Sequence, residues 1–152
     1  MLNIKKSSKG FTLIELLVVI GILGILLAIV LIAINPARQF AQANNTARRS
    51  DVVAILNAIH QYSADNKGKL PAGITAVAQE ISSAGADICA DISPKYISAL
   101  PIDPDETLGT SPFVDCTSYD TGYTVVNTAG RVTVAAPGAE AVDGAVVISV
   151  TR

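Results

Sequence analysis

The first chemistry that the residue types suggest is the neutralisation of one carboxylate at the edge of a membrane. Glu15 directly precedes the nineteen residues 16–34, which contain no charged and no strongly polar side chain. A charge inside hydrocarbon costs on the order of 2.5–3.5 kcal/mol, so a carboxylate in that position needs a cationic partner. The residues alone leave two interpretations open. Glu15 is either solvated at the membrane interface or paired with a cation of a neighbouring subunit.

The apolar run has the length of a membrane-spanning helix. At 1.5 Å per residue, about 20 residues cross a hydrocarbon core of roughly 30 Å. The run is too long for the apolar region of a signal peptide, and no small-residue cleavage site follows it, so we expect it to remain in the mature protein. Lys5, Lys6 and Lys9 precede the run. They predict a cytoplasmic N-terminus, with the C-terminal part outside the cytoplasmic membrane.

The segment from Lys9 to Ile20 resembles the class III leader junction of type IV prepilins and pseudopilins. It consists of a basic residue, Gly10, Phe11, three further residues, Glu15 and an unbroken apolar run. The resemblance implies that a membrane-embedded prepilin peptidase cleaves between Gly10 and Phe11, and that the new amine of Phe11 is N-methylated. It also implies that Glu15 pairs with the Phe11 amine of an adjacent copy during assembly.

Physical chemistry agrees with these implied roles. Cleavage removes all three lysines and creates one ammonium group, which Glu15 can neutralise between staggered helices. Gly10 suits a scissile position because a residue without a side chain lets a protease approach the backbone. Thr12 is interpreted as an ordinary interfacial residue. The implied partners are further copies of the chain, the prepilin peptidase, an inner-membrane assembly platform and, before assembly into an extracellular filament, membrane lipid.

Composition argues against several other functions. Removal of residues 1–10 takes away three of eleven basic residues and none of thirteen acidic ones, which leaves a formal charge of −5. An acidic exterior disfavours nonspecific nucleic-acid binding. We find no nucleophile elbow, metal triad or phosphate-binding loop, and the single histidine, His60, has no plausible nucleophile beside it. We therefore predict a protein that is not an enzyme and that needs no cofactor.

The two cysteines, Cys89 and Cys116, lie in the part predicted to be outside the cytoplasm, where disulfides persist. We predict that they form a bridge, which stabilises a loop of this size by roughly 3 kcal/mol. Metal ligation is the alternative, but His60 lies far from both cysteines in sequence and no zinc spacing is present.

A cluster of acidic residues follows the first of these cysteines. Carboxylates supply the hard oxygen ligands that calcium prefers, and some major pseudopilins, which this chain resembles, bind calcium in a comparable loop. The spacing is not that of an EF-hand, and acidic loops are usually solvated. We therefore predict no metal site and keep calcium as the weaker alternative. Its candidate ligands are Asp103, Asp105, Asp115 and Asp120, with Glu106 in the same cluster.

The residues after the apolar run predict a continued helix. Asn35-Pro36 predicts a kink where the chain leaves the membrane. From Val52 onward, apolar residues recur at helical spacing, and Lys67-Gly68 provides a stop signal. We therefore expect one kinked helix over residues 11–66, roughly 80 Å long. His60 is placed on its solvated polar face, together with Asp51.

The remaining chain predicts a small sheet packed on this helix. Residues 75–83 have the spacing of a short helix, and residues 85–121 are rich in loops. Residues 122–127, 131–135 and 145–151 have strand composition, with a tight hairpin at residues 127–130. The expected fold is α+β, with one long helix on three or four antiparallel strands. The predicted organisation is a leader at 1–10, a transmembrane assembly helix at 11–35, an amphipathic continuation at 36–68 and a globular part at 69–152.

Two related functions remain open. The first is a structural subunit of a type IV pilus-like surface filament. The second is the major pseudopilin of a type II secretion system, or a competence pseudopilin. The segment from Tyr96 to Pro104 resembles a pseudopilin pattern and favours the second, whereas a bridge between Cys89 and Cys116 is more typical of pilins. A membrane-anchored enzyme and a single-pass protein with a binding domain are weaker alternatives.

Overall fold

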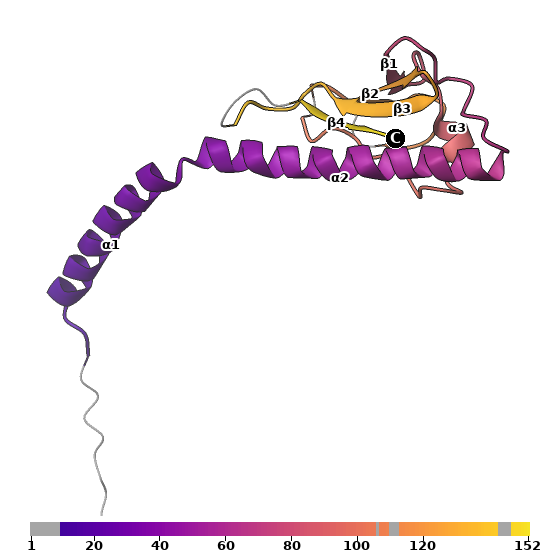
Figure 1. The fold of residues 1–152 in the computed structure, drawn as a ribbon. Coiled ribbons are helices and arrows are strands. Elements are labelled where there is room, and N and C mark those ends of the chain that lie inside the picture. Colours follow the sequence, from indigo (N-terminus) through magenta and orange to yellow (C-terminus); the bar gives the residue numbers. More distant parts are fainter. Residues whose placement is uncertain (1–9, 106, 110–112, 143–146) are drawn as a thin grey trace, which may run out of the picture. The chain divides into compact units, whose positions relative to one another are not determined.

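The structure is a computed structural model that describes residues 10–105, 107–109, 113–142 and 147–152 (Figure 1). The chain divides into two compact units, Met1–Gln39 and Phe40–Arg152. The first contains helix α1, Leu13–Ile34. The second contains most of helix α2, Pro36–Asp65, together with a four-stranded sheet and the short helix α3, Cys89–Ile92.

A side-chain cap starts α1, and a left-handed residue ends it. Thr12 has extended backbone angles and occupies the N-cap, and Asn35 takes the C-cap with a φ of 47°. None of the 22 residues of α1 is buried. A helix that is apolar on all sides and covered on none needs lipid or other helices around it.

The kink predicted at Asn35-Pro36 is a complete break, because Asn35 separates two helices. Its positive φ turns the backbone out of the helical conformation, and Pro36, at the first position of α2, has no N–H for a helical bond. The Asn35 carbonyl accepts hydrogen bonds from the N–H groups of Arg38 and Gln39 at 3.1 and 3.3 Å. Its side-chain Oδ1 also accepts from the Arg38 N–H at 3.4 Å. Asn35 therefore ends one helix and caps the next.

The amphipathic pattern of α2 is confirmed. Val52, Ile55, Leu56 and Ile59 are fully buried, as their spacing predicts. The helix ends at Asp65, and Gly68, with a φ of 83°, donates its N–H to the Ser63 carbonyl at 2.8 Å. This is the glycine stop expected from the sequence.

The sheet is antiparallel and has the strand order β1-β2-β3-β4. Its strands are β1 (Gln79–Ser82), β2 (Asp120–Thr128), β3 (Arg131–Ala136) and β4 (Ile148–Thr151). The predicted hairpin is confirmed: Thr128 pairs with Arg131, and the intervening Ala129 and Gly130 both have positive φ, as in type I′ turns.

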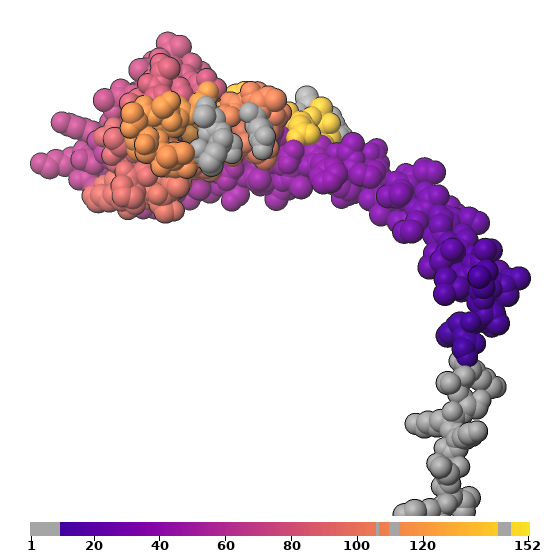
Figure 2. Space-filling view, turned by 180° about the vertical axis from the view of Figure 1, so that it is seen from behind, coloured from indigo at the N-terminus to yellow at the C-terminus, as the bar shows by residue number. Residues whose placement is uncertain are grey.

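The core lies between α2 and the sheet, which runs along one side of the helix in both views (Figure 1, Figure 2). From the sheet it receives Tyr123 and Val125 of β2 and Val132 and Val134 of β3, each at most 1% exposed. The alternating burial along β3 fits a strand with one covered face. The predicted α+β class is confirmed.

The short helix expected at residues 75–83 is wrong. Residues 79–82 form the edge strand β1, in which Gln79 pairs with Val125 and Glu80 with Thr124. In a helix, Val77 would share a face with the buried Ile74 and Ile81, yet its side chain is 69% exposed. A short apolar run does not distinguish helix from strand, and here a partner about forty residues downstream decides it.

Candidate functional site

A reciprocal cap joins Thr12 and Glu15 at the start of α1. The Thr12 N–H donates to Glu15 Oε2 at 2.8 Å, and its hydroxyl donates to the same oxygen at 2.7 Å. The Glu15 N–H donates in return to Thr12 Oγ1 at 3.3 Å. This is a capping box, which satisfies backbone donors that the first helical turn leaves free. Thr12, interpreted from the sequence as an interfacial residue, thus also caps α1.

The predicted processing residues lie beside this cap. Gly10 and Phe11 precede Thr12 and are exposed, Phe11 to 88%. Lys5, Lys6 and Lys9 belong to residues 1–9, which lie outside the described residues. Cleavage after Gly10, methylation of Phe11 and pairing through Glu15 stay predictions.

Helix α1 has the properties of a membrane span. Within the part of the chain that the structure describes, it is the one helix that is long and apolar enough, with a mean hydropathy of 3.4. Since none of its residues is buried, α1 does not act as a core helix of its own unit.

A second polar cluster is buried in the other unit and centres on Arg48. The guanidinium makes a bidentate pair with Asp103, in which Nε lies 2.8 Å from Oδ2 and Nη2 lies 2.7 Å from Oδ1. Both side chains are fully buried. The hydrogen bond with Asp103 raises the pKa of Arg48 and so keeps the guanidinium charged. This pair fixes the loop that carries Asp103 onto α2.

Arg48 also holds a second loop through Glu140. Its Nη1 lies 3.1 Å from Glu140 Oε1 and 3.2 Å from Asn45 Oδ1. The Asn45 amide in turn bonds the backbone of Glu140 at both ends, donating to its carbonyl at 2.8 Å and accepting from its N–H at 3.0 Å. Two segments far apart in sequence are thus tied to one face of α2.

The other acidic residues make local turns. Asp105 accepts from the Thr107 N–H at 3.0 Å, Asp115 from the Thr117 N–H at 2.8 Å and Asp120 from the Gly122 N–H at 3.0 Å. The side-chain acceptor of a turn stabilises the loop without any metal. Glu106 lies outside the described residues. Among those that are described, no three His, Cys, Asp or Glu side chains gather as metal ligands would.

Cys89 and Cys116 form a disulfide in the structure, with Cα atoms 5.4 Å apart. Cys89 begins α3 and is fully buried. Tyr119 supports the same helix, because its hydroxyl accepts from the N–H groups of Ile88 and Cys89 at 3.1 and 3.2 Å. The hydroxyl donates to Asp87 at 2.9 Å. Burial raises the pKa of Tyr119 to about 12, so the phenol stays protonated.

The polar face predicted for α2 is partly covered. Asp51 accepts a hydrogen bond of 2.7 Å from the hydroxyl of Tyr123, and burial raises the pKa of the Asp51 carboxyl. His60 is only partly exposed, and its Nε2 is buried. The prediction of a solvated polar face is therefore wrong for Asp51, because Tyr123 of β2 contacts it, and only partly correct for His60.

Comparisons with known proteins agree with the N-terminal arrangement. The family described as the prokaryotic N-terminal methylation motif matches residues 5–31. The fimbrial protein EcpC of Eikenella corrodens is 35% identical over 122 residues, which cover 78% of this chain and 68% of that protein. The chain belongs to the type IV pilin and pseudopilin family. Like the other members, it is a structural subunit.

A second relative of this pilin-like chain comes from a secretion system. The type II secretion system core protein G of Aeromonas hydrophila is 40% identical over 62 residues, or 41% of this chain and 42% of that protein. No solved structure matches the chain. Both relatives are structural proteins of one family, and both a pilus and a secretion pseudopilus are compatible with them.

Sequence reasoning missed two residues of this pilin-like chain, although signals for both were present. Thr12 and Glu15 have the Thr-x-x-Glu spacing of a capping box before an apolar run. Arg48 lies four residues before Val52, so the apolar stripe of α2, extended backward, falls on it. A charged residue at a core-facing position predicts a buried partner, which is Asp103.

Proposed function

We propose that the chain is the subunit of a type IV pilus-like surface filament. A prepilin peptidase removes residues 1–10, the amine of Phe11 is methylated, and copies polymerise through α1. Before assembly, α1 lies in the cytoplasmic membrane with its N-terminus on the cytoplasmic side. An inner-membrane platform then extracts the subunit, and the globular part is carried outside.

One observation carries this proposal: Glu15 lies at the exposed start of an unburied apolar helix, within the matched methylation motif. In lipid, a lone carboxylate needs compensation, and the new Phe11 ammonium of an adjacent copy supplies it. The Thr12 cap keeps the Glu15 side chain at the end of the helix until that cation arrives. Neutralisation then favours the assembled state over the solitary one.

The test replaces Glu15 with valine and measures surface fibres after shearing. We expect the variant to insert into the membrane but to form no filaments, because the Phe11 ammonium lacks its counter-charge. Leu17→Val is the matched control, since it changes the same helix without removing a charge, and it should assemble. Normal filaments from Glu15→Val would refute pairing through this residue.

A second variant tests processing separately from assembly. In Gly10→Val, the added side chain should block the approach of the peptidase, so the leader remains attached. Mass spectrometry of the wild-type fibre should find a chain that begins at methylated Phe11. Fibres whose subunits begin at Met1 or Leu2 would contradict cleavage after Gly10.

The major pseudopilin of a type II secretion system is the second candidate, and its support is the similarity to core protein G. The segment Tyr96–Pro104 favoured it from sequence, but its residues now have roles in the fold. Leu100 is buried, and Asp103 binds Arg48. The pattern therefore indicates a shared globular architecture more than a secretion role. Deletion of the gene should abolish surface fibres under the first proposal and export of folded proteins under the second.

A further inference from the structure

The two edges of the sheet are protected to different degrees. The strand order places β1 at one edge and β4 at the other (Figure 1). On β1, the register with β2 shifts between Glu80 and Ser82, and the Glu80 carbonyl accepts a hydrogen bond from the Ala86 N–H at 2.8 Å. An irregular register, a charged side chain and an already bonded backbone group each hinder the addition of another strand. The β1 edge is therefore protected against pairing with a second chain.

The β4 edge has no such protection. Its four residues include no charged residue and no proline, and their register with β3 is regular from Ile148 to Thr151. One step further, Val132 and Arg152 exchange two backbone hydrogen bonds, of 2.8 and 3.0 Å. Because hydrogen-bonded pairs alternate along an antiparallel ladder, Ser149 and Thr151 direct their N–H and C=O groups away from β3. Both residues are exposed, and their backbones make no hydrogen bond outside the sheet with any residue that the structure describes.

The residues along this edge suit a second copy of the same strand. The chain has a net negative charge, which disfavours contact between copies, whereas β4 itself is uncharged. Val147, which precedes β4, is 85% exposed, so covering it is favourable. An antiparallel pairing centred on Ser149 brings Val147 of one copy opposite Thr151 of the other. Cross-strand pairs of β-branched and hydroxyl side chains stabilise sheets, and Thr133 and Thr151 already form one, with their Oγ1 atoms 2.8 Å apart.

We propose that β4 of one copy pairs antiparallel with β4 of a second copy across a two-fold axis, so that the two sheets become one continuous sheet. The backbone groups of Ser149 bond those of Ser149 in the second copy, and Thr151 bonds Val147 at either end. Such a contact is isologous, whereas the contacts that lengthen a filament are head-to-tail. It therefore joins copies in neighbouring filaments, where repeated weak contacts add up to a strong attachment.

This contact goes beyond the proposed filament function. It requires only the globular unit, which contains all of β4, and it does not require α1. Glu15→Val should stop filament growth but leave the pairing of β4 intact. The failure of either proposal would therefore be visible without the failure of the other.

The first test is a cross-link across the two-fold axis. Full-length Ser149→Cys is oxidised in dodecylphosphocholine micelles and separated on a non-reducing gel. In the proposed pairing, the two introduced cysteines have Cα atoms about 5.5 Å apart, a distance that a disulfide spans readily. We expect a covalent dimer as the main product, and its absence would overturn the proposal.

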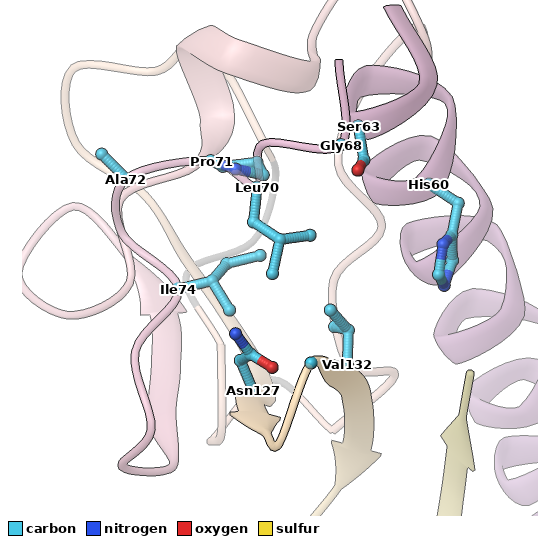
Figure 3. Close-up of a pocket in the computed structure, with 10 residues that line it drawn as sticks. His60, Ser63, Gly68, Leu70, Pro71, Ala72, Ile74, Asn127 and Val132 are labelled. Carbon is cyan, nitrogen blue, oxygen red and sulfur yellow. The ribbon is translucent and has the colours of Figure 1, made fainter. Parts of the chain in front are cut away.

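Thr128→Cys is the matched control for this cross-link. Thr128 is exposed on β2, two strands from β4. It follows Asn127, which lines a pocket of about 520 Å³ together with Val132 and to which β4 contributes no residue (Figure 3). The control should stay monomeric. Equal yields of dimer from the two variants would indicate random collision and would count against pairing through β4.

A second test checks the register and the backbone hydrogen bonds. Copies with Val147→Cys, mixed with copies with Thr151→Cys, should form mixed dimers, because these two positions lie opposite each other. Ser149→Pro in both copies removes an N–H that faces away from β3, so it should lower the yield of mixed dimers at least about tenfold without lowering the thermal midpoint. Ser149→Ala keeps that N–H and should cross-link like the parent. An undiminished yield of mixed dimers from folded Ser149→Pro would refute the pairing.

Discussion

Arg48 and Asp103 form a bidentate ion pair in which both side chains are fully shielded from solvent, 55 residues apart in sequence. Such a pair is a modest source of net stability, because removing two charges from water nearly offsets their attraction. Removing one partner alone, however, lowers the stability strongly, because the remaining charge is then buried without compensation.

Arg48→Met should therefore destabilise the globular part by about 3–5 kcal/mol, measured by chemical denaturation. The double variant Arg48→Met/Asp103→Leu should regain much of that loss, because no fully buried carboxylate is left without a partner; Glu140, which also loses Arg48, is partly exposed. The exposed pair of Lys95 with Asp65 provides the matched control. Lys95→Ala should leave the denaturation midpoint nearly unchanged, because an exposed ion pair contributes little. Equal losses at both sites would contradict the importance of burial.

The Thr12 hydroxyl should control fraying at the start of α1. Thr12→Val removes the side-chain acceptor for the Glu15 N–H, at a cost of about 1 kcal/mol of helix stability. In micelles, amide hydrogen exchange of residues 13–16 should become faster. Thr12→Ser keeps a hydroxyl and should exchange at the wild-type rate. If the serine and valine variants behave alike, the cap is not formed by this oxygen.

Asp51 should make the globular part less stable as pH rises. Burial raises its folded-state pKa above the ordinary value, so the folded state binds more protons than the unfolded state in the window just above pH 3.8. Stability from this group is complete below that pH and is lost as pH rises through the higher folded pKa. Asp51→Asn keeps an acceptor for Tyr123 but cannot ionise.

The stability gained by Asp51→Asn over wild type should therefore grow with pH above about 4 and then level off. Thermal unfolding followed by circular dichroism at a series of pH values measures this difference. Asp51→Asn lacks only one titrating group, so other pH effects cancel in the comparison. A gain that shrinks as pH rises would reverse the assigned direction of the shift.

The bridge between Cys89 and Cys116 should stabilise the globular part. Replacing both cysteines with serine should cost about 3 kcal/mol, because the 27-residue separation leaves a large loop free in the unfolded chain. Thermal unfolding without reductant measures the loss, and wild type treated with reductant should match the variant. Two free thiols in a non-reducing mass measurement of wild type would remove the basis of this prediction.

Local patterns were sufficient for much of the fold. The stripe from Val52 to Ile59, the stop at Gly68 and the hairpin around Gly130 all depend on neighbouring residues, and the structure confirms them. Features that depend on partners distant in sequence are harder to predict. The sequence predicts a helix where β1 forms, because β2, the partner of β1, follows some forty residues later.

The same distinction between neighbouring and distant residues applies to the candidate sites. The N-terminal motif was identified because all of its residues lie within one short segment. The Arg48 pair was missed because Asp103 lies in a loop whose position no local pattern predicts. The sequence instead places Asp103 among the acids of the weaker calcium alternative. The partial burial of His60 likewise depends on segments that lie far from it in sequence.

Asn35 interrupts the helical hydrogen bonding between α1 and α2. The ladder of helical hydrogen bonds starts afresh there, with the Asn35 carbonyl and side chain as its first acceptors. Unwinding that begins in α1 therefore meets a break in the backbone hydrogen bonds before it reaches α2. Under the proposed assembly, α1 can therefore unwind while α2 and the sheet packed on it stay folded.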